Sequence, residues 1–358
     1  MRHALSAPAL AALLIAGTAL AQPPATQPAS STAPASASSA AAADEARLSP
    51  ADRKRLQAIR QYQHDLVSVV ALRADPDYLL GAAILAKPFK NPTQGLDFDA
   101  LSQRAAAAPD AGAAAEWARL DACTSEKDCP NAQAFDWLKQ HAADNAAVWM
   151  VALDVAARDK NDKAERAALK QAAAAKTYDD YYGKTLAGVA KAVGVLPPLA
   201  DTMQGAHDGQ PDNADGVRML VAVTSTQDHI RPAFGPLEQL CGDDASKDDD
   251  LKSDCLKLAH TLQWGSSPIA RAVGLHIQGA LNPDEKSRND QASQNLAWQV
   301  HQYSALLQRS LTDASQASRW LTTARNGGTE LSLMLATLRA NQVPLEAPAP
   351  AGAASTGQ

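Results

Sequence analysis

Apolar residues recur every three to four positions along most of the chain, which is the spacing that lines one face of an α-helix. The stretch 144–183 shows this pattern twice, with a polar turn at 158–163 between the two runs. The apolar positions are Trp149, Ala152, Leu153 and Ala156 in the first run, and Ala164, Ala167, Ala168, Leu169 and Ala172 in the second. Asp144 suits the N-cap of the first helix, because its carboxylate can accept hydrogen bonds from free N–H groups. The stretch therefore predicts two antiparallel helices.

The same pattern occurs twice upstream, in the stretches 75–109 and 110–143. The aligned positions are Tyr78, Gly81, Ala82, Leu85, Phe98, Leu101 and Ala105 in the first stretch, and Trp117, Leu120, Phe135, Leu138 and Ala142 in the second. Trp117 precedes Trp149 by 32 residues, and Leu138 precedes Leu169 by 31. A period in this range indicates stacked helical hairpins. The alternative is that alanine-rich helices align with one another without being repeats.

A large residue early in the first helix, with small residues where the two helices meet, resembles the tetratricopeptide repeat, although the proline that closes that repeat is absent. The resemblance implies a TPR-like α-solenoid of stacked antiparallel hairpins over residues 47–183. Such a stack binds partners on a concave surface. First-helix residues that face away from the second helix would line it, here Met150, Asp154 and Arg158.

Three of the six tyrosines lie in one short segment, at Tyr178, Tyr181 and Tyr182, beside two aspartates. One interpretation is a rim that recognises a peptide or a sugar, because tyrosine offers a flat contact area and a hydroxyl. The other is a structural plug that fills the junction between the repeat region and the rest of the chain. As a rim, the segment would lie near the concave surface lined by Met150, Asp154 and Arg158.

Helical spacing continues through residues 184–343, and no stretch has the pattern of a strand. The sequence thus predicts an all-α fold in which further helices follow the repeat region. Ser49 before Pro50 is expected to cap the first helix of the folded part. Gly274 and Gly279 lie in one predicted helix, where they would allow a neighbouring helix to approach closely.

The two ends of the chain differ from the rest in composition. Residues 1–21 combine a basic start, an apolar run and Ala-Leu-Ala before Gln22, which predicts a cleaved signal peptide. Residues 22–46 and 344–358 are rich in Ala, Ser and Pro and are expected to be disordered. No later run has the length of a membrane span. The expected location is the periplasm or the outside of the cell.

The chain is mildly acidic, with a formal net charge of −6 that becomes −7 without the predicted signal peptide. This charge argues against nucleic acid and against an anionic membrane surface as partners. A protein or peptide partner is the remaining expectation. Abundant alanine and few aromatic residues favour packed helices over sheets.

Four cysteines in an exported chain indicate two disulfides. Three connectivities are possible, and the local one, Cys123 with Cys129 and Cys241 with Cys255, requires the fewest long-range contacts. A zinc site is the alternative, but these spacings fit no usual zinc pattern. The acidic run between Cys241 and Cys255 lacks the glycine and glutamate of an EF-hand loop, so a solvated connector is expected there.

The sequence nominates no catalytic residue, metal site or cofactor. The eight histidines are scattered, and no nucleophile elbow, Walker loop or dinucleotide fingerprint occurs. The VWMVALDVAAR…YDDYYG segment and the cysteine placement resemble uncharacterised, alanine-rich exported proteins of Gram-negative bacteria. That resemblance implies a helical periplasmic protein and carries over no functional residue.

Together these observations predict a non-catalytic periplasmic binding or scaffold protein with a protein or peptide partner. Two alternatives place a site between the helical halves. One is a hydrolase or cell-wall enzyme, which requires titratable groups buried in a cleft. The other is a small-ligand carrier, which requires a closed pocket walled by Trp and Tyr.

Overall fold

The computed structural model describes residues 48–89, 95–123, 128–206 and 209–348. All regular secondary structure in these ranges is helical, apart from one isolated β-bridge between Asn145 and Thr177. This confirms the predicted all-α class. The predicted signal peptide at 1–21 and the linker at 22–46 lie outside the described residues. None of the described helices is long and apolar enough to cross a membrane.

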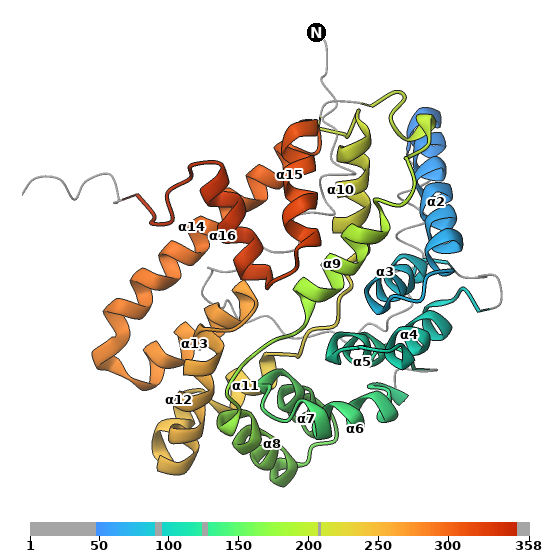
Figure 1. Ribbon diagram of the computed structural model, residues 1–358. Coiled ribbons are helices and arrows are strands. Elements are labelled where there is room, and N and C mark those ends of the chain that lie inside the picture. The colour runs from blue at the N-terminus through green and yellow to red at the C-terminus, as the bar shows by residue number, and fades with distance from the viewer. Residues whose placement is uncertain (1–47, 90–94, 124–127, 207–208, 349–358) are drawn as a thin grey trace, which may run out of the picture.

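Seven helices follow one another along one side of the molecule (Figure 1). They are α2 (Pro50–Val70), α3 (Pro76–Ala86), α4 (Phe98–Ala107), α5 (Ala113–Arg119), α6 (Ala132–His141), α7 (Ala146–Arg158) and α8 (Asp162–Ala174). The first begins as expected, because the Ser49 side chain accepts a hydrogen bond from the backbone N–H of Asp52. Each helix contacts the next one in the series, most extensively in α3/α4 and α7/α8, and α5 contacts both α4 and α6.

The hairpin of α7 and α8 is antiparallel, as its sequence predicts. The N–H of Ala146 donates to the carbonyl of Thr177 at 2.7 Å, and that of Lys176 donates to the carbonyl of Asp144 at 2.9 Å. The start of α7 therefore lies beside the residues that follow α8. The N-cap is Asn145 rather than Asp144, since the Asn145 side chain accepts from the N–H of Ala147. Asp144 instead offers its backbone carbonyl to the end of the hairpin.

After α8 the chain returns through the middle of the molecule as α9 (Tyr182–Ala192), and the helices from residue 249 onward form the opposite side (Figure 1). Helix α9 packs against α3, α10 and α15. The later helices are α10 (Ala214–Ser225), α11 (Gly235–Leu240), α12 (Asp249–Gln263), α13 (Pro268–Leu281), α14 (Lys286–Ser310), α15 (Ala314–Arg325) and α16 (Glu330–Ala340). Short 3-10 turns occur at Ala200–Thr202, Asp243–Lys247 and Pro283–Glu285.

Two of the three hydrophobic cores combine helices from both sides of residue 183. One core joins α2, α3, α4 and α5 to α9, α10 and α15, with Tyr62 and Trp320 among its members. A second core contains residues of the helices α5, α6, α7 and α8 together with residues of α11, α12 and α13. A third, smaller core lies between α13, α14 and α16. The regions 47–183 and 184–343 therefore share the two larger cores.

Two glycines bring α3 and α9 into backbone contact. A Cβ atom on Gly188 would lie 2.6 Å from the carbonyl oxygen of Asp77, and one on Gly81 would lie 2.3 Å from that of Gly188. Gly274 brings α13 into backbone contact with α12, because a Cβ atom on Gly274 would lie 2.5 Å from the carbonyl oxygen of Ala259. At Gly279, in contrast, the nearest atom would be the Cβ of Asn289 at 3.9 Å, an ordinary contact.

We expect Gly188→Ala to lower the free energy of unfolding by about 1–3 kcal/mol, because the added methyl must push α3 and α9 apart. Gly279→Ala is the matched control, since it adds the same methyl to a helix with open space. It should raise stability by about 0.5–1 kcal/mol through better helix propensity. Urea denaturation followed by circular dichroism measures both. Equal effects of the two substitutions would show that the α3–α9 contact is not tight.

Both predicted disulfides are present with the local connectivity. Cys123 pairs with Cys129 at a Cα–Cα distance of 5.5 Å, and Cys241 pairs with Cys255 at 5.6 Å. Near the end of the chain, residues 344–347 lie within the tail predicted to be disordered. They are hydrogen-bonded to α14, where Trp298 Nε1 donates to the carbonyl of Pro344 and Gln299 Nε2 to that of Leu345. The structure thus places this part of the tail on the surface of a helix.

Candidate functional site: a polar cluster between the helical regions

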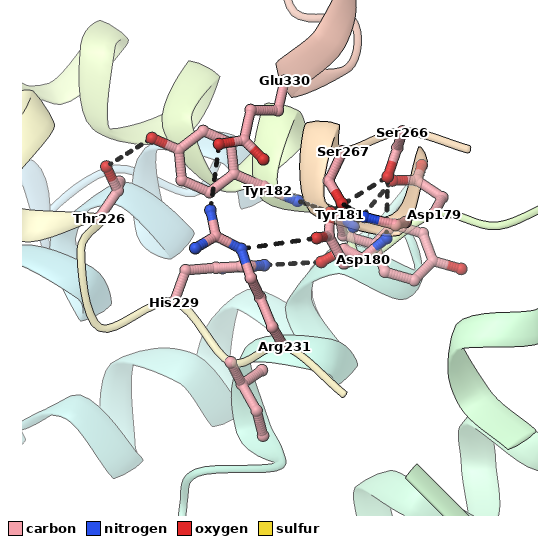
Figure 2. Close-up of polar contacts among 12 residues, drawn as sticks. Asp179, Asp180, Tyr181, Tyr182, Thr226, His229, Arg231, Ser266, Ser267 and Glu330 are labelled. Atoms are coloured by element: carbon pink, nitrogen blue, oxygen red, sulfur yellow. Dashed lines mark hydrogen bonds and ion pairs between the residues drawn. The ribbon is translucent and has the colours of Figure 1, made fainter. Parts of the chain in front are cut away.

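Four connecting segments converge between the helices, at residues 175–181, 226–234, 264–267 and 326–329 (Figure 2). The backbone N–H of Ser266 donates to the carbonyl of Tyr178, and that of Leu331 donates to the carbonyl of Ser266, both at 3.0 Å. We call the polar side chains gathered here the seam cluster. Its members are Asp180, Tyr182, His229, Arg231, Ser266 and Glu330.

Asp180 is the buried centre of the seam cluster, with 0% of its surface exposed. Its Oδ1 atom accepts hydrogen bonds from the hydroxyl of Ser266 at 3.1 Å and from the backbone N–H of Tyr182 at 3.3 Å. The Oδ2 atom accepts no hydrogen bond and faces Arg231 Nε at 3.8 Å. Burial is the largest effect on this carboxyl and raises its pKa, while Arg231 acts in the opposite direction. The charge of Asp180 thus depends on the guanidinium.

Arg231 connects Asp180 to Glu330 (Figure 2). Its guanidinium donates to Glu330 Oε1 at 3.2 Å and lies over the ring of Tyr182, 5.1 Å from the centroid. The guanidinium of Arg231 therefore forms ion pairs with two carboxyl groups, those of Asp180 and Glu330. Burial, with a further contribution from the charge of Asp180, raises the pKa of Glu330 to about 7 despite Arg231. Glu330 is consequently a carboxyl group that titrates near neutral pH.

His229 is buried against the ring of Tyr182, with ring centroids 5.5 Å apart in an edge-to-face arrangement. Its Nε2 atom lies 2.6 Å from the backbone carbonyl oxygen of Asp180. Because a carbonyl only accepts, Nε2 carries the hydrogen. Burial lowers the pKa of His229 to about 3, so the ring is neutral at physiological pH. It holds the 226–234 segment against the 175–181 segment.

The structure places the three predicted tyrosines at the seam. Tyr178 is buried in the second core, Tyr181 packs against Trp117 with ring centroids 5.6 Å apart, and Tyr182 reaches the hydroxyl of Thr226 at 3.4 Å. Tyr181 has a left-handed backbone conformation, with φ of 57°. Its backbone N–H donates to the side chain of Asp179. This turn precedes the first residue of α9, and the three tyrosine side chains on either side of it contact different parts of the protein.

The residues predicted to line a concave surface do not share one environment. Met150 has 0% exposure and is part of the second core. The prediction that Met150 lines an open surface is therefore wrong. The apolar positions of α7 extend around most of the helix, because α7 is covered by several neighbours. Asp154 is partly exposed and Arg158 is exposed, with Arg158 donating to the carbonyl of Cys129 at 3.1 Å.

The tyrosine segment and Arg158 lie at opposite ends of α7. Asn145, at the start of α7, donates to the carbonyl of Asp179 at 2.7 Å. Arg158 is the last residue of the helix, about 20 Å further along at 1.5 Å per residue. The structure therefore does not bring the two predicted parts of a binding surface together.

Sequence reasoning missed His229, Arg231, Ser266 and Glu330. They come from two connections and the start of α16, which are far apart in the chain, so no short spacing unites them. The one available signal was the YDDYYG segment, which contains Asp180. Within the described ranges, no three His, Cys, Asp or Glu side chains are grouped as a metal site requires.

Comparisons of the chain with known proteins match no protein-family model, no curated protein and no solved structure. The fold and the seam cluster define an all-helical protein with two disulfides and a charged junction between its helical regions. Its function is therefore inferred from geometry and surface chemistry.

Proposed function

We propose that the protein is a non-catalytic binding or scaffold protein of the periplasm that presents a helical surface to a protein or peptide partner. The two disulfides support an oxidising compartment outside the cytosol. The hairpins α3/α4, α5/α6 and α7/α8 support a TPR-like stack in which successive helices contribute to one surface.

The observation that carries this proposal is a set of partly exposed aromatic side chains around the connection between α6 and α7. Trp137 stacks on His141 with ring centroids 4.2 Å apart, and Trp149 donates its Nε1 hydrogen to the carbonyl of Ala143 at 2.7 Å. Lys139 lies over the ring of Phe135 on the same helix. Tryptophan at a surface is enriched among the residues that dominate protein interfaces. These contacts hold the rings in place before a partner arrives, which lowers the entropic cost of binding.

The seam cluster supports the non-catalytic part of the proposal. Asp180 and His229 are buried, and the hydrogen bonds Ser266–Asp180 and His229–Asp180 each tie one connecting segment to another. The charges are thus engaged in joining helices rather than in facing a substrate.

An affinity pull-down from periplasmic extract, with the mature protein as bait, tests the proposal. One reproducible partner should be captured by the wild type and lost with Trp137→Ser. Trp298→Ser is the matched control, because Trp298 is a partly exposed tryptophan on α14, on the other side of the molecule (Figure 1). Loss with both variants, or with neither, would contradict a binding surface at α6 and α7.

A second candidate function is the hydrolase or cell-wall enzyme. It is favoured by Glu330, a carboxyl group with a pKa near 7 whose side chain is 23% exposed beside the guanidinium of Arg231. Such a group can donate or accept a proton at neutral pH. Incubation with purified peptidoglycan fragments, followed by mass spectrometry, would reveal products from the wild type and none from Glu330→Gln. If the wild type forms no product, the second candidate is excluded for this substrate class.

A further inference from the structure

A hollow of about 320 Å³ lies where α12, α13 and α14 meet. We call it the α12–α14 hollow. Its walls come from the end of α12, one face of α13 and the first turns of α14, and the side chains discussed below are Trp264, Arg271, Leu275, Arg288, Asn289 and Ala292. The volume is at the lower end of the range of small-ligand pockets. This is an open surface site in the second half of the chain, unlike the closed pocket between halves that a carrier would need.

Two of the polar side chains that line this hollow, Arg271 and Asn289, have a buried donor atom without an acceptor, whereas Gln263 donates to the carbonyl of Gly274 at 3.5 Å. Arg271 Nε is buried and has no hydrogen-bond partner, and neither an ion pair nor a side-chain hydrogen bond of Arg271 occurs among the described residues. Asn289 is only 5% exposed, and its Nδ2 atom is also buried without a partner. A buried donor without an acceptor is costly for a folded protein. Two such donors in one hollow indicate a site built for an acceptor that is not part of the chain.

The charge in the hollow points to an anion with a single charge. None of the side chains that line it is acidic. Burial lowers the pKa of Arg271, and no neighbouring carboxylate counters that effect. Arg288, at the rim, is already paired with Glu285. One unpaired guanidinium is therefore balanced by one negative charge, which fits a carboxylate better than a doubly charged phosphate.

The rest of the hollow suits the carbon skeleton of such a ligand. Trp264 directly follows α12 and is 76% exposed, although exposing a large indole to water is unfavourable. Leu275 and Ala292 add apolar surface from α13 and α14. An apolar or aromatic group bound beside the donors would cover part of the indole.

We propose that the α12–α14 hollow binds a carboxylate through Arg271 and Asn289, with the attached apolar group against the indole of Trp264. The carboxylate has two possible sources, the C-terminus of a peptide or a free small organic acid, which share this chemistry. The inference goes beyond the proposed function, since it stands whether or not a protein partner binds at α6 and α7.

Isothermal titration calorimetry on the full chain tests the proposal with N-acetyl-phenylalanine and its amide as probes. The acid should bind and the amide should bind at least about tenfold more weakly, because only the acid offers a charged acceptor. An N-acetylated Ala-Ala-Phe peptide distinguishes the sources. Tighter binding than N-acetyl-phenylalanine assigns the site to peptide C-termini, and equal binding assigns it to free acids. Absent binding of both acids, equal binding of acid and amide, or preferential binding of inorganic phosphate would overturn the proposal.

Arg271→Met and Trp264→Ser locate the binding on the protein. Arg271→Met should abolish binding while the chain stays folded, because it removes a buried charge without leaving a partner unpaired. Trp264→Ser changes an exposed side chain and should weaken binding of the phenyl probes. Arg319→Met, which changes an exposed arginine on α15, is the matched control and should bind like the wild type. Unchanged affinity in both hollow variants would place the binding elsewhere and overturn the assignment.

Discussion

Arg231→Ala is expected to lower the free energy of unfolding by about 3 kcal/mol, the low end of the range for breaking a buried ion pair. The reason is that Asp180 has 0% exposure and its Oδ2 atom faces no other polar partner than Arg231. Removing the guanidinium leaves a buried carboxyl group with its charge uncompensated. Chemical denaturation at neutral pH, followed by circular dichroism, measures the loss.

A double-mutant cycle separates this charge effect from lost packing. In an Asp180→Asn background, Arg231→Ala should cost about 2 kcal/mol less than in the wild type, because no buried charge is then left unpaired. Arg231→Lys should fall between the wild type and Arg231→Ala, since it keeps the charge but not the planar guanidinium. A cost of about 0.5 kcal/mol or less for Arg231→Ala would instead be typical of a surface ion pair.

Glu330→Gln is expected to change how stability depends on pH. The pKa of Glu330 is raised from 4.5 to about 7 in the folded protein. Between these two values the native state holds a proton that the unfolded chain has released, so the contribution of Glu330 to stability falls as pH rises. Glutamine stays neutral throughout. Near pH 4.5 the free energy of unfolding of the variant should therefore equal that of the wild type. Above pH 7 it should be higher than that of the wild type by up to about 3 kcal/mol.

His229 provides an internal check on this result. Its pKa is lowered from 6.5 to about 3, so the unfolded chain takes up a proton in that window while the native state does not. Stability from His229 therefore rises with pH, opposite to the trend from Glu330. Where the two windows overlap, the contributions of His229 and Glu330 to wild-type stability oppose each other, whereas in Glu330→Gln the contribution of His229 is no longer offset by residue 330. Parallel pH profiles of variant and wild type, from urea denaturation, would show that the carboxyl of Glu330 titrates normally.

Much of the fold was accessible from the sequence, because helical periodicity and capping act over short distances. The Ser49 cap, the α7/α8 hairpin and the role of Gly274 all depend on residues close in the chain or on small size alone. Gly279 lies in the same helix as Gly274 and makes no close contact, because the position of α14 decides what it meets. Packing between distant helices is not encoded in local spacing.

The candidate sites were accessible only in part. The tyrosine segment drew attention to the seam, but the partners of Asp180 lie 51 and 86 residues away, at Arg231 and Ser266. Met150 shows the opposite error, since a residue on a predicted outer face is buried in the core that α7 shares with several other helices. Arg271 and Asn289 carry no sequence signal, because a missing partner becomes visible only when every neighbour is placed.

The path of α9 also bears on how the chain acquires its structure. The core that contains α2 and α3 is completed by α9, α10 and α15, so Tyr62 and Trp320 belong to one packed unit despite their distance in the sequence. Folds with such a large sequence separation between contacts are slow to form, because a long loop must close before the contacts stabilise it. The amino-terminal hairpins therefore remain without their full cover until the carboxyl-terminal helices have been synthesised. Folding of this core is therefore expected to finish only once α15 is available to close it.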